Sequence, residues 1–268
     1  EGIINKNNEV NDYDSSSNVT NNQNQNQTPS QDGKISENIN NTEPTKEITV
    51  SGTAVKGIIS DGIVTVFSLA SGNKSQEPLV QAVTHDSGHY SIKINDYDGP
   101  VLIEITANPG SSKMICDVIT GCGDYKFGSK VGLNSDFKLQ SVVSDLEVDK
   151  PNIANLNTLT SLVSAQVLSQ QNIDSKKILD ANSQVADLFD LSGNISEMTV
   201  VDITNDSMLK NADPDIIMYS ILNSAIVSAS SNDTNSISTA IKKLTNNFLK
   251  HNGQLSNNST RDVSLATI

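Results

Sequence analysis

The spacing of apolar residues changes near position 150, and this change constrains the fold more than any other feature. Before it, short stretches alternate apolar and polar residues, as in Ile63-Val64-Thr65-Val66-Phe67. Such alternation, bounded by turns such as Asp86-Ser87-Gly88, is typical of half-buried β-strands. Strands are expected at residues 48–55, 63–67, 89–94 and 101–107. Short strands at this spacing predict an antiparallel, Ig-like or transthyretin-like β-sandwich over 47–145.

Beyond this point, apolar residues recur every three or four positions, which is typical of amphipathic helices. Four apolar stripes start near Leu156, Ile178, Ile217 and Ile237. Asp174 is a suitable N-cap for the second helix, and Asp213-Pro214 would open the third with Pro in its first turn. Because such helices can bury one another, we expect a four-helix domain over 152–251.

The two ends of the chain lack both patterns. Residues 1–46 are rich in Asn, Gln and Ser, and such a stretch cannot bury enough apolar surface to offset its ordering entropy. We expect it to be a disordered polar tether, and residues 252–268 to be a flexible tail. The predicted fold class is therefore α+β with two domains, a β-sandwich followed by an α-helical bundle.

The composition excludes some classes of partner. The formal net charge is −13, which argues against nucleic acid, because phosphate binding depends on Lys and Arg. It also argues against docking on an anionic membrane through a basic patch. No apolar run reaches the roughly 18–20 residues that span a bilayer.

The chain contains two cysteines, Cys116 and Cys122. A close pair in an otherwise cysteine-free chain predicts a local structural disulfide. A redox dithiol usually has the Cys-x-x-Cys spacing, and a zinc site would need two further ligands. A structural disulfide indicates an oxidising compartment, so we expect an extracellular or cell-envelope location, such as the periplasm or the cell surface.

Two motifs resemble known modules. Val50-Ser51-Gly52-Thr53-Ala54, followed by 84–92 (Thr-His-Asp-Ser-Gly-His-Tyr-Ser-Ile), is similar to the carboxypeptidase regulatory-like, transthyretin-like sandwich domains. The run from Met114 through Cys122-Gly123 to Gly128 resembles uncharacterised surface lipoproteins of Gram-negative bacteria, in which such a sandwich precedes a helical domain. The segments 157–162, 181–189 and 201–204 are similar to parts of that second domain. The resemblance implies a sandwich followed by a helical domain and a location as an outer-membrane lipoprotein, and it carries no active-site residue. A lipid-modified Cys directly ahead of Glu1 would fit it, and membrane attachment is expected only through such an anchor.

The candidate metal and carboxylate sites are weak. His85 and His89 flank a turn, so their spacing does not bring them together on a helix face, and His251 is the only other His. The loop Asn95-Asp96-Tyr97-Asp98-Gly99 is similar to the start of a calcium loop but lacks its later bidentate Glu. Asp213 and Asp215 are better explained as helix-start residues than as a catalytic pair.

No nucleophile elbow or phosphate-binding glycine loop occurs. We therefore predict no catalytic residue, cofactor or metal site, and no enzyme.

The leading hypothesis is a non-catalytic bacterial surface or secreted protein that acts in protein binding, adhesion or assembly of a surface structure, including a fibre. Its partner would be another protein, or copies of itself joined through exposed strand edges. The alternative is a carbohydrate-binding module with Tyr90, Tyr97 and Tyr125 as candidate sugar platforms. A hydrolase with an unrecognised site is a third hypothesis, because fold alone does not exclude a function.

Overall fold

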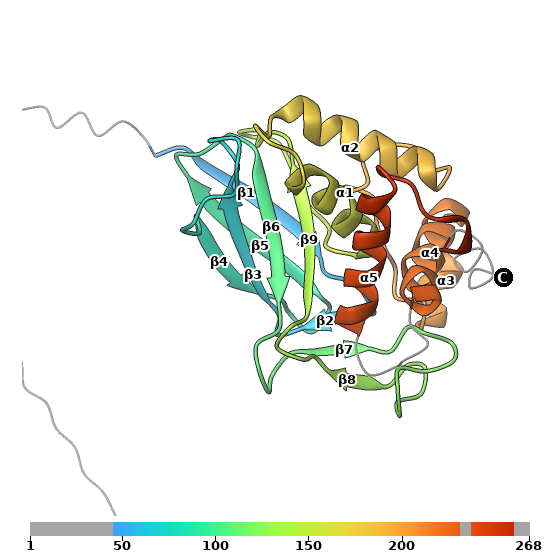
Figure 1. Ribbon diagram of the computed structural model, residues 1–268. Coiled ribbons are helices and arrows are strands. Elements are labelled where there is room, and N and C mark those ends of the chain that lie inside the picture. The colour runs from blue at the N-terminus through green and yellow to red at the C-terminus, as the bar shows by residue number, and fades with distance from the viewer. Residues whose placement is uncertain (1–44, 231–236, 260–268) are drawn as a thin grey trace, which may run out of the picture. The chain divides into compact units, whose positions relative to one another are not determined.

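The computed structural model describes residues 45–230 and 237–259, and they belong to one compact α+β unit (Figure 1). Its strands are β1 (Glu47–Thr53), β2 (Ile59–Ser60), β3 (Ile63–Ser68), β4 (Val80–Val83), β5 (His89–Asn95), β6 (Val101–Thr106), β7 (Lys113–Ile115), β8 (Lys130–Gly132), β9 (Lys138–Val143) and β10 (Asn152–Ile153). Its helices are α1 (Thr158–Leu168), α2 (Ser175–Leu188), α3 (Asp206–Asn211), α4 (Pro214–Ser230) and α5 (Ile237–Lys250). The mixture of antiparallel sheets and helices confirms the α+β class.

The strands form three sheets. The first sheet has the order β10-β1-β5, the second has the order β4-β3-β6-β9, and β2-β7-β8 form a small three-stranded ribbon. All pairs are antiparallel except β1 with β10. Alternate residues of β1 and β5, such as Val50 and Ile92, share one apolar core with Val66 and Ile103 of the second sheet. The first two sheets therefore face each other in a sandwich-like arrangement.

The second sheet is the middle layer of the unit. Ile103 and Ile105 of β6 point into the core between the sheets, whereas Leu102 belongs to a second core with helix residues Leu159 and Leu162. Because both faces are covered, β6 is buried along almost its whole length. Figure 1 shows the helices gathered on one side of the sheets. The helices thus cover the sheet directly, with α1 against β9.

Polar contacts also join the helical and strand layers. Asn157 caps α1, and its side chain and that of Thr160 form a reciprocal capping box. The Asn223 amide of α4 donates to the Val55 carbonyl at 3.0 Å and accepts from the Thr158 N–H at 2.9 Å. One side chain therefore connects the segment after β1 to the start of α1.

The structure agrees with some of the predicted elements and differs from others. The strands expected at 48–55, 63–67, 89–94 and 101–107 correspond to β1, β3, β5 and β6. Asp174 caps α2 and Pro214 is the first residue of α4, as predicted. The separation into a sandwich domain and a helical bundle is not confirmed, because both segments share cores. Residues 152–153, assigned to the helical region, instead form β10.

Some expectations fall outside the described residues. The tether predicted over 1–46 lies outside them except for its last two residues, and so does most of the tail predicted over 252–268.

Candidate functional site

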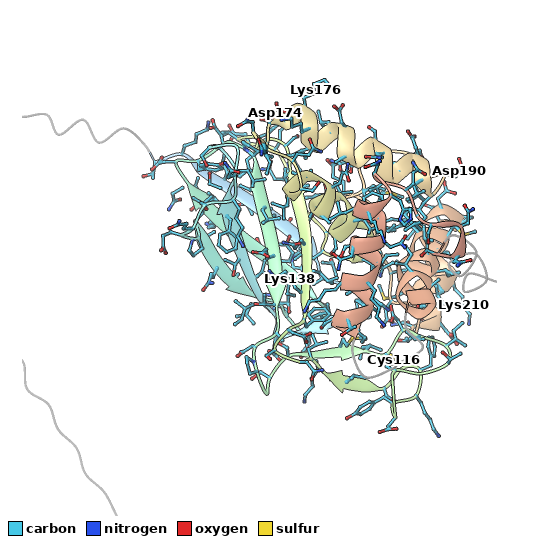
Figure 2. All side chains as sticks on the ribbon, viewed as in Figure 1. Cys116, Lys138, Asp174, Lys176, Asp190 and Lys210 are labelled. Atoms are coloured by element: carbon cyan, nitrogen blue, oxygen red, sulfur yellow. A yellow bond between two sulfur atoms is a disulfide. The ribbon has the colours of Figure 1, made fainter. Side chains whose placement is uncertain are left out.

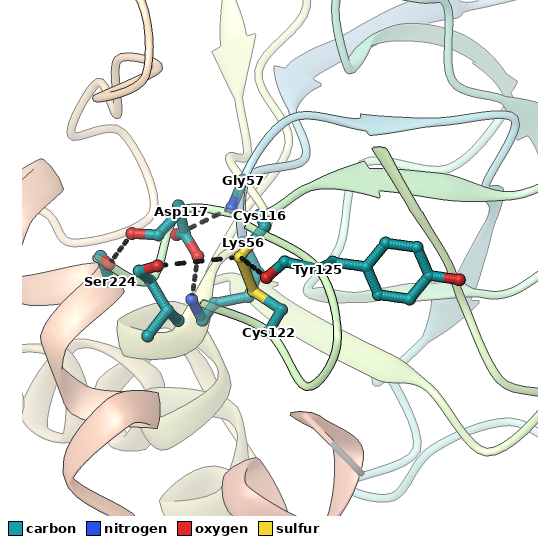
Figure 3. The surroundings of a disulfide bond; sticks show 8 residues. Lys56, Gly57, Cys116, Asp117, Cys122, Tyr125 and Ser224 are labelled. Atoms are coloured by element: carbon teal, nitrogen blue, oxygen red, sulfur yellow. Dashed lines mark hydrogen bonds and ion pairs between the residues drawn. A yellow bond between two sulfur atoms is a disulfide. The ribbon is translucent and has the colours of Figure 1, made fainter. Parts of the chain in front are cut away.

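The connection between β7 and β8 displays large apolar side chains. We call residues 116–129 the disulfide loop, because Cys116 and Cys122 form a disulfide with a Cα–Cα distance of 5.8 Å. The exposed fractions are 82% for Ile119, 49% for Tyr125 and 40% for Phe127. In Figure 3 the Tyr125 ring points away from the disulfide. Several exposed large apolar groups on one short loop are unusual for a surface that contacts only water.

The same region carries positive charge. Lys126 lies between the two exposed aromatic residues, and Lys113 and Lys130 are exposed on the ribbon. Since Lys130 pairs with Ile115 in the β7–β8 register, Lys113 and Lys130 share one face of the ribbon. Asp124 is the one exposed carboxylate between residues 111 and 132. In a chain of net charge −13, this face is locally cationic.

Backbone hydrogen bonds fix the shape of the disulfide loop. Cys122 and Tyr125 exchange two of them, with N···O distances of 2.8 and 3.2 Å. At the base of the loop, Gly128 N–H donates to Cys116 O and Cys116 N–H donates to Ser129 O, both at 2.8 Å. The disulfide and these bonds together hold Tyr125 and its neighbours before any partner binds, which lowers the entropic cost of binding.

A buried ion pair joins the disulfide loop to the turn after β1. Lys56 Nζ donates to Asp117 Oδ1, and the two side chains are 0% and 4% exposed. Asp117 Oδ2 accepts from the Gly57 N–H at 2.9 Å, and the Asp117 carbonyl accepts from Ser224 Oγ of α4 at 2.6 Å (Figure 3). We call Lys56 and Asp117 the sealed pair. It connects the turn after β1, the disulfide loop and α4.

The turn that carries Lys56 requires glycine at the next position. Gly57 has φ +55°, a left-handed conformation that is strained for other residues. A Cβ on Gly57 would also lie 1.6 Å from the Ile115 carbonyl oxygen. The close approach of this turn to β7 therefore depends on the absence of a side chain, and it places Gly57 N–H against Asp117.

A second buried carboxylate lies on the second sheet. Glu104 of β6 is 4% exposed, and it pairs with Lys74 and with Lys138, the latter at 2.8 Å. It also accepts a hydrogen bond from Gln140 at 2.9 Å. Burial by itself would raise the pKa of Glu104, but the hydrogen bonds and charges of Lys138 and Lys74 outweigh it and leave the pKa below its usual value. We call these four residues the open cluster, because the side chains of its lysines are 34% and 46% exposed. Figure 2 labels Lys138 of the open cluster and Cys116 of the disulfide loop.

Clefts on the helical side of the described residues include two that hold carboxylates. One of about 350 Å³ lies between β9, α1 and α5, and its carboxylate, Asp136, pairs with Lys242 at 3.3 Å. The other, of about 470 Å³, lies along α2, and its Asp180 pairs with Lys176 at 2.6 Å. Each of these two clefts thus contains a carboxylate that is held in an ion pair with a lysine.

The predicted metal and carboxylate candidates have ordinary structural roles. His85 and His89 are exposed at the turn before β5. Asp96 and Asp98 both bind Lys46, through its backbone N–H at 2.9 Å and its ammonium group, respectively. The Lys46 hydrogen bond and charge hold the pKa of Asp98 below its usual value. Within 45–230 and 237–259, no three His, Cys, Asp or Glu side chains form a group that could hold a metal ion.

The three tyrosines proposed as sugar platforms have different environments. Tyr90 is fully buried and donates to the Ala154 carbonyl, and burial raises its pKa above the usual value. It was therefore wrongly placed among the candidates. Tyr97 is half-buried, and its hydroxyl donates to Pro100 O at 2.6 Å and accepts from Ser68 at 3.0 Å. Tyr125 alone of the three is exposed.

No protein-family model, curated protein or solved structure matches this chain. Within the described ranges, no helix is both long and apolar enough to cross a membrane.

Proposed function

We propose that this chain is a non-catalytic binding protein of the bacterial cell surface or secreted space, and that it contacts a protein partner through the disulfide loop. The observation that carries the proposal is the fixed display of Ile119, Tyr125 and Phe127 on one loop. Aromatic residues are enriched in the centres of protein interfaces, where they fill pockets of the partner.

The charge around the loop specifies the kind of partner. Lys113 and Lys130 lie just outside the two ends of the disulfide loop and Lys126 lies within it, with Asp124 as the exposed opposing charge. An acidic surface with an apolar pocket would complement this arrangement. Charges at the rim of an interface mainly increase the association rate and its dependence on salt. The proposal therefore includes a partner whose association slows as salt is added.

The proposed location and module type rest on two observations. The Cys116–Cys122 disulfide is the kind of bond that persists in an oxidising compartment. The Val50–Ala54 and 84–92 motifs resemble those of carboxypeptidase regulatory-like domains. In this proposal the two facing sheets are such a sandwich module, the helices are its companion domain, and a lipid anchor ahead of Glu1 attaches it to the outer membrane.

The test is site-specific crosslinking on intact cells that produce the protein. A photoreactive residue at Ile119 should yield a discrete adduct with a protein. The same residue at Leu179, an exposed apolar position of α2 with 52% exposure, should not. The triple variant Ile119→Ser, Tyr125→Ser, Phe127→Ser should abolish co-purification of the partner. Adducts from Leu179 as strong as those from Ile119 would contradict the role of the loop.

The exposed edge of the second sheet is the competing protein-binding surface. β4 has a partner on one side within its sheet, and Val83 and the preceding Leu79 are 49% and 39% exposed. Such an edge can accept a strand from another chain, including another copy of this one. If Val83→Lys abolishes the interaction and the loop variant does not, assembly occurs through β4 and the loop proposal is wrong.

Carbohydrate binding is a second candidate, because Tyr125 and Phe127 are both exposed and lie two positions apart, on either side of Lys126. Aromatic faces can stack on sugars. A glycan array should then show selective binding that is lost in Tyr125→Ala and retained in Tyr97→Ala, since the Tyr97 hydroxyl is already engaged by Pro100 and Ser68.

A further inference from the structure

We propose that Lys56 and Asp117 become joined by an amide bond between Nζ and Cγ, which gives the protein an internal covalent cross-link besides its disulfide. The inference rests on the burial of Lys56 and Asp117 and on their hydrogen bonds. It would hold whatever the disulfide loop binds.

The sealed pair differs from the other described ion pairs in its isolation from water. Its side chains are 0% and 4% exposed, whereas each other described pair contains at least one side chain that is 34% or more exposed. Removal of two charges from water carries a large desolvation penalty, and only excellent geometry with further hydrogen bonds offsets it. The protein must therefore supply enough hydrogen-bond partners for both charged groups.

An ammonium group has three N–H donors. Among the residues that the structure describes, Lys56 Nζ has one acceptor, Asp117 Oδ1. An amide nitrogen would retain a single N–H, so the cross-linked form leaves fewer donors without a partner. Asp117 Oδ2 would become the amide oxygen and would keep its hydrogen bond from Gly57 N–H. The site thus fits the amide better than the ion pair.

The same contacts favour the reaction itself. The Gly57 N–H bond polarises the Asp117 carboxyl group toward negative charge on Oδ2, which is the charge that develops when Nζ adds to Cγ. The turn at Gly57 and the Ser224 bond to the Asp117 carbonyl hold both residues in place. Two groups held in contact react as if each were present at very high concentration.

The reaction is a condensation and needs no oxidant or cofactor. A proton moves along the hydrogen bond from Nζ to Oδ1, and this gives an amine and a carboxylic acid. The Nζ–Cγ bond forms, the Cγ–Oδ1 bond breaks, and Oδ1 leaves as water with two protons that were carried by Nζ. One proton stays on the amide nitrogen, and water leaves as the single by-product.

The test is mass spectrometry of the full chain after reduction and alkylation. The protein should be lighter than the mass calculated for its alkylated sequence by one water, about 18 Da. Trypsin does not cleave after an acylated lysine, so the digest should contain residues 47–74 joined to 114–126 as one branched species. Separate linear peptides 47–56, 57–74 and 114–126 would overturn the proposal. A water loss located elsewhere, such as at Asp61-Gly62, would overturn it as well.

Lys56→Arg is the matched variant, because it keeps the positive charge but lacks the amine that forms the amide. It should have the full sequence mass, and so should Asp117→Ala. The branched species should be absent from both digests. If either variant fails to fold, the peptide map of the unmodified chain still decides, since it requires no variant. A branched species that persists in Lys56→Arg would contradict the assignment to Lys56.

Discussion

The sealed pair and the open cluster each bury a carboxylate, but they differ in how far its lysine partners reach water. Asp117 has one lysine, which is itself fully buried, whereas Glu104 has two lysines whose side chains reach water. In the open cluster, water solvates the ammonium groups and the buried oxygens still receive several donors. In the sealed pair, water reaches neither group, so the protein alone must stabilise both charges. Because the two carboxylates are equally buried, we expect the exposure of the cation to decide how strongly the fold depends on each pair.

The largest effect is expected from Lys56→Met, which leaves the Asp117 carboxylate buried without the lysine that it contacts, either as an ion pair or through the proposed amide. Loss of one partner from a buried pair lowers the free energy of unfolding by about 3–5 kcal/mol. Urea denaturation measures this change. The double variant Lys56→Met, Asp117→Leu should recover part of it, because no buried charge remains. An effect below that of Glu104→Gln would contradict the distinction between the two sites.

Removal of the disulfide should have the next largest effect. The double variant Cys116→Ala, Cys122→Ala opens a loop of sequence separation 6, which lowers the free energy of unfolding by about 2 kcal/mol on the chain-entropy model. Hydrogen exchange of the amides of 116–129 should also accelerate. Because Asp117 follows Cys116 directly, this variant tests how far the sealed pair depends on the disulfide loop around it.

Glu104→Gln should have a smaller effect that depends on pH. The pKa of Glu104 is lowered in the folded protein. Its contribution to stability is therefore complete above the unfolded pKa of about 4.3 and is lost as the pH falls through the lower folded value. The variant should be less stable by about 1 kcal/mol at neutral pH, and the difference should shrink under acid conditions. Thermal unfolding between neutral and acidic pH measures it. A difference that grows on acidification would contradict the sign of the shift.

The smallest effect on stability is expected from Ile119→Ser, since this side chain is 82% exposed. The free energy of unfolding should change by no more than about 0.5 kcal/mol, as measured by urea denaturation. Binding of the partner should nevertheless weaken. A large loss of stability would mean that Ile119 has a structural role, and the binding test would then need Tyr125→Ser in its place.

The sequence predicted β1, β3, β5 and β6 and missed the other six described strands. β1 and β5 alternate clearly, because Ile48, Val50, Ile92 and Ile94 face the core and the residues between them face water. The pattern did not reveal β7, β8 and β10, because two or three residues are too short to establish a period. It also could not show that β6 lies between two layers, since Glu104 looks like a solvent-facing residue until Lys74 and Lys138 are placed beside it.

The candidate site was predicted only in part. The cysteine pair could be found by counting, and Tyr125 was named as a candidate platform. Lys56 was missed, although it lies within the apolar run Ala54-Val55-Lys56-Gly57-Ile58-Ile59, which is a recognisable signal of a buried charge. Its partner could not be identified from the same signal, because Asp117 is 61 positions away. Only the approach of β7 to the turn at Gly57 brings them together.

The central position of β1 in the first sheet has a mechanical consequence. β1 is bonded to β5 on one side and to β10 on the other. The ladder hydrogen bonds run perpendicular to the strands in the antiparallel β1–β5 pair and at a slant in the parallel β1–β10 pair. A pulling force that enters through the residues before Glu47 therefore acts along β1 and loads both ladders in shear, so that many bonds must break together. Lys56 follows the end of this strand closely. A cross-link there would pass the load to the disulfide loop, and a protein held at one end and loaded through its partner would resist extension along the line that joins them.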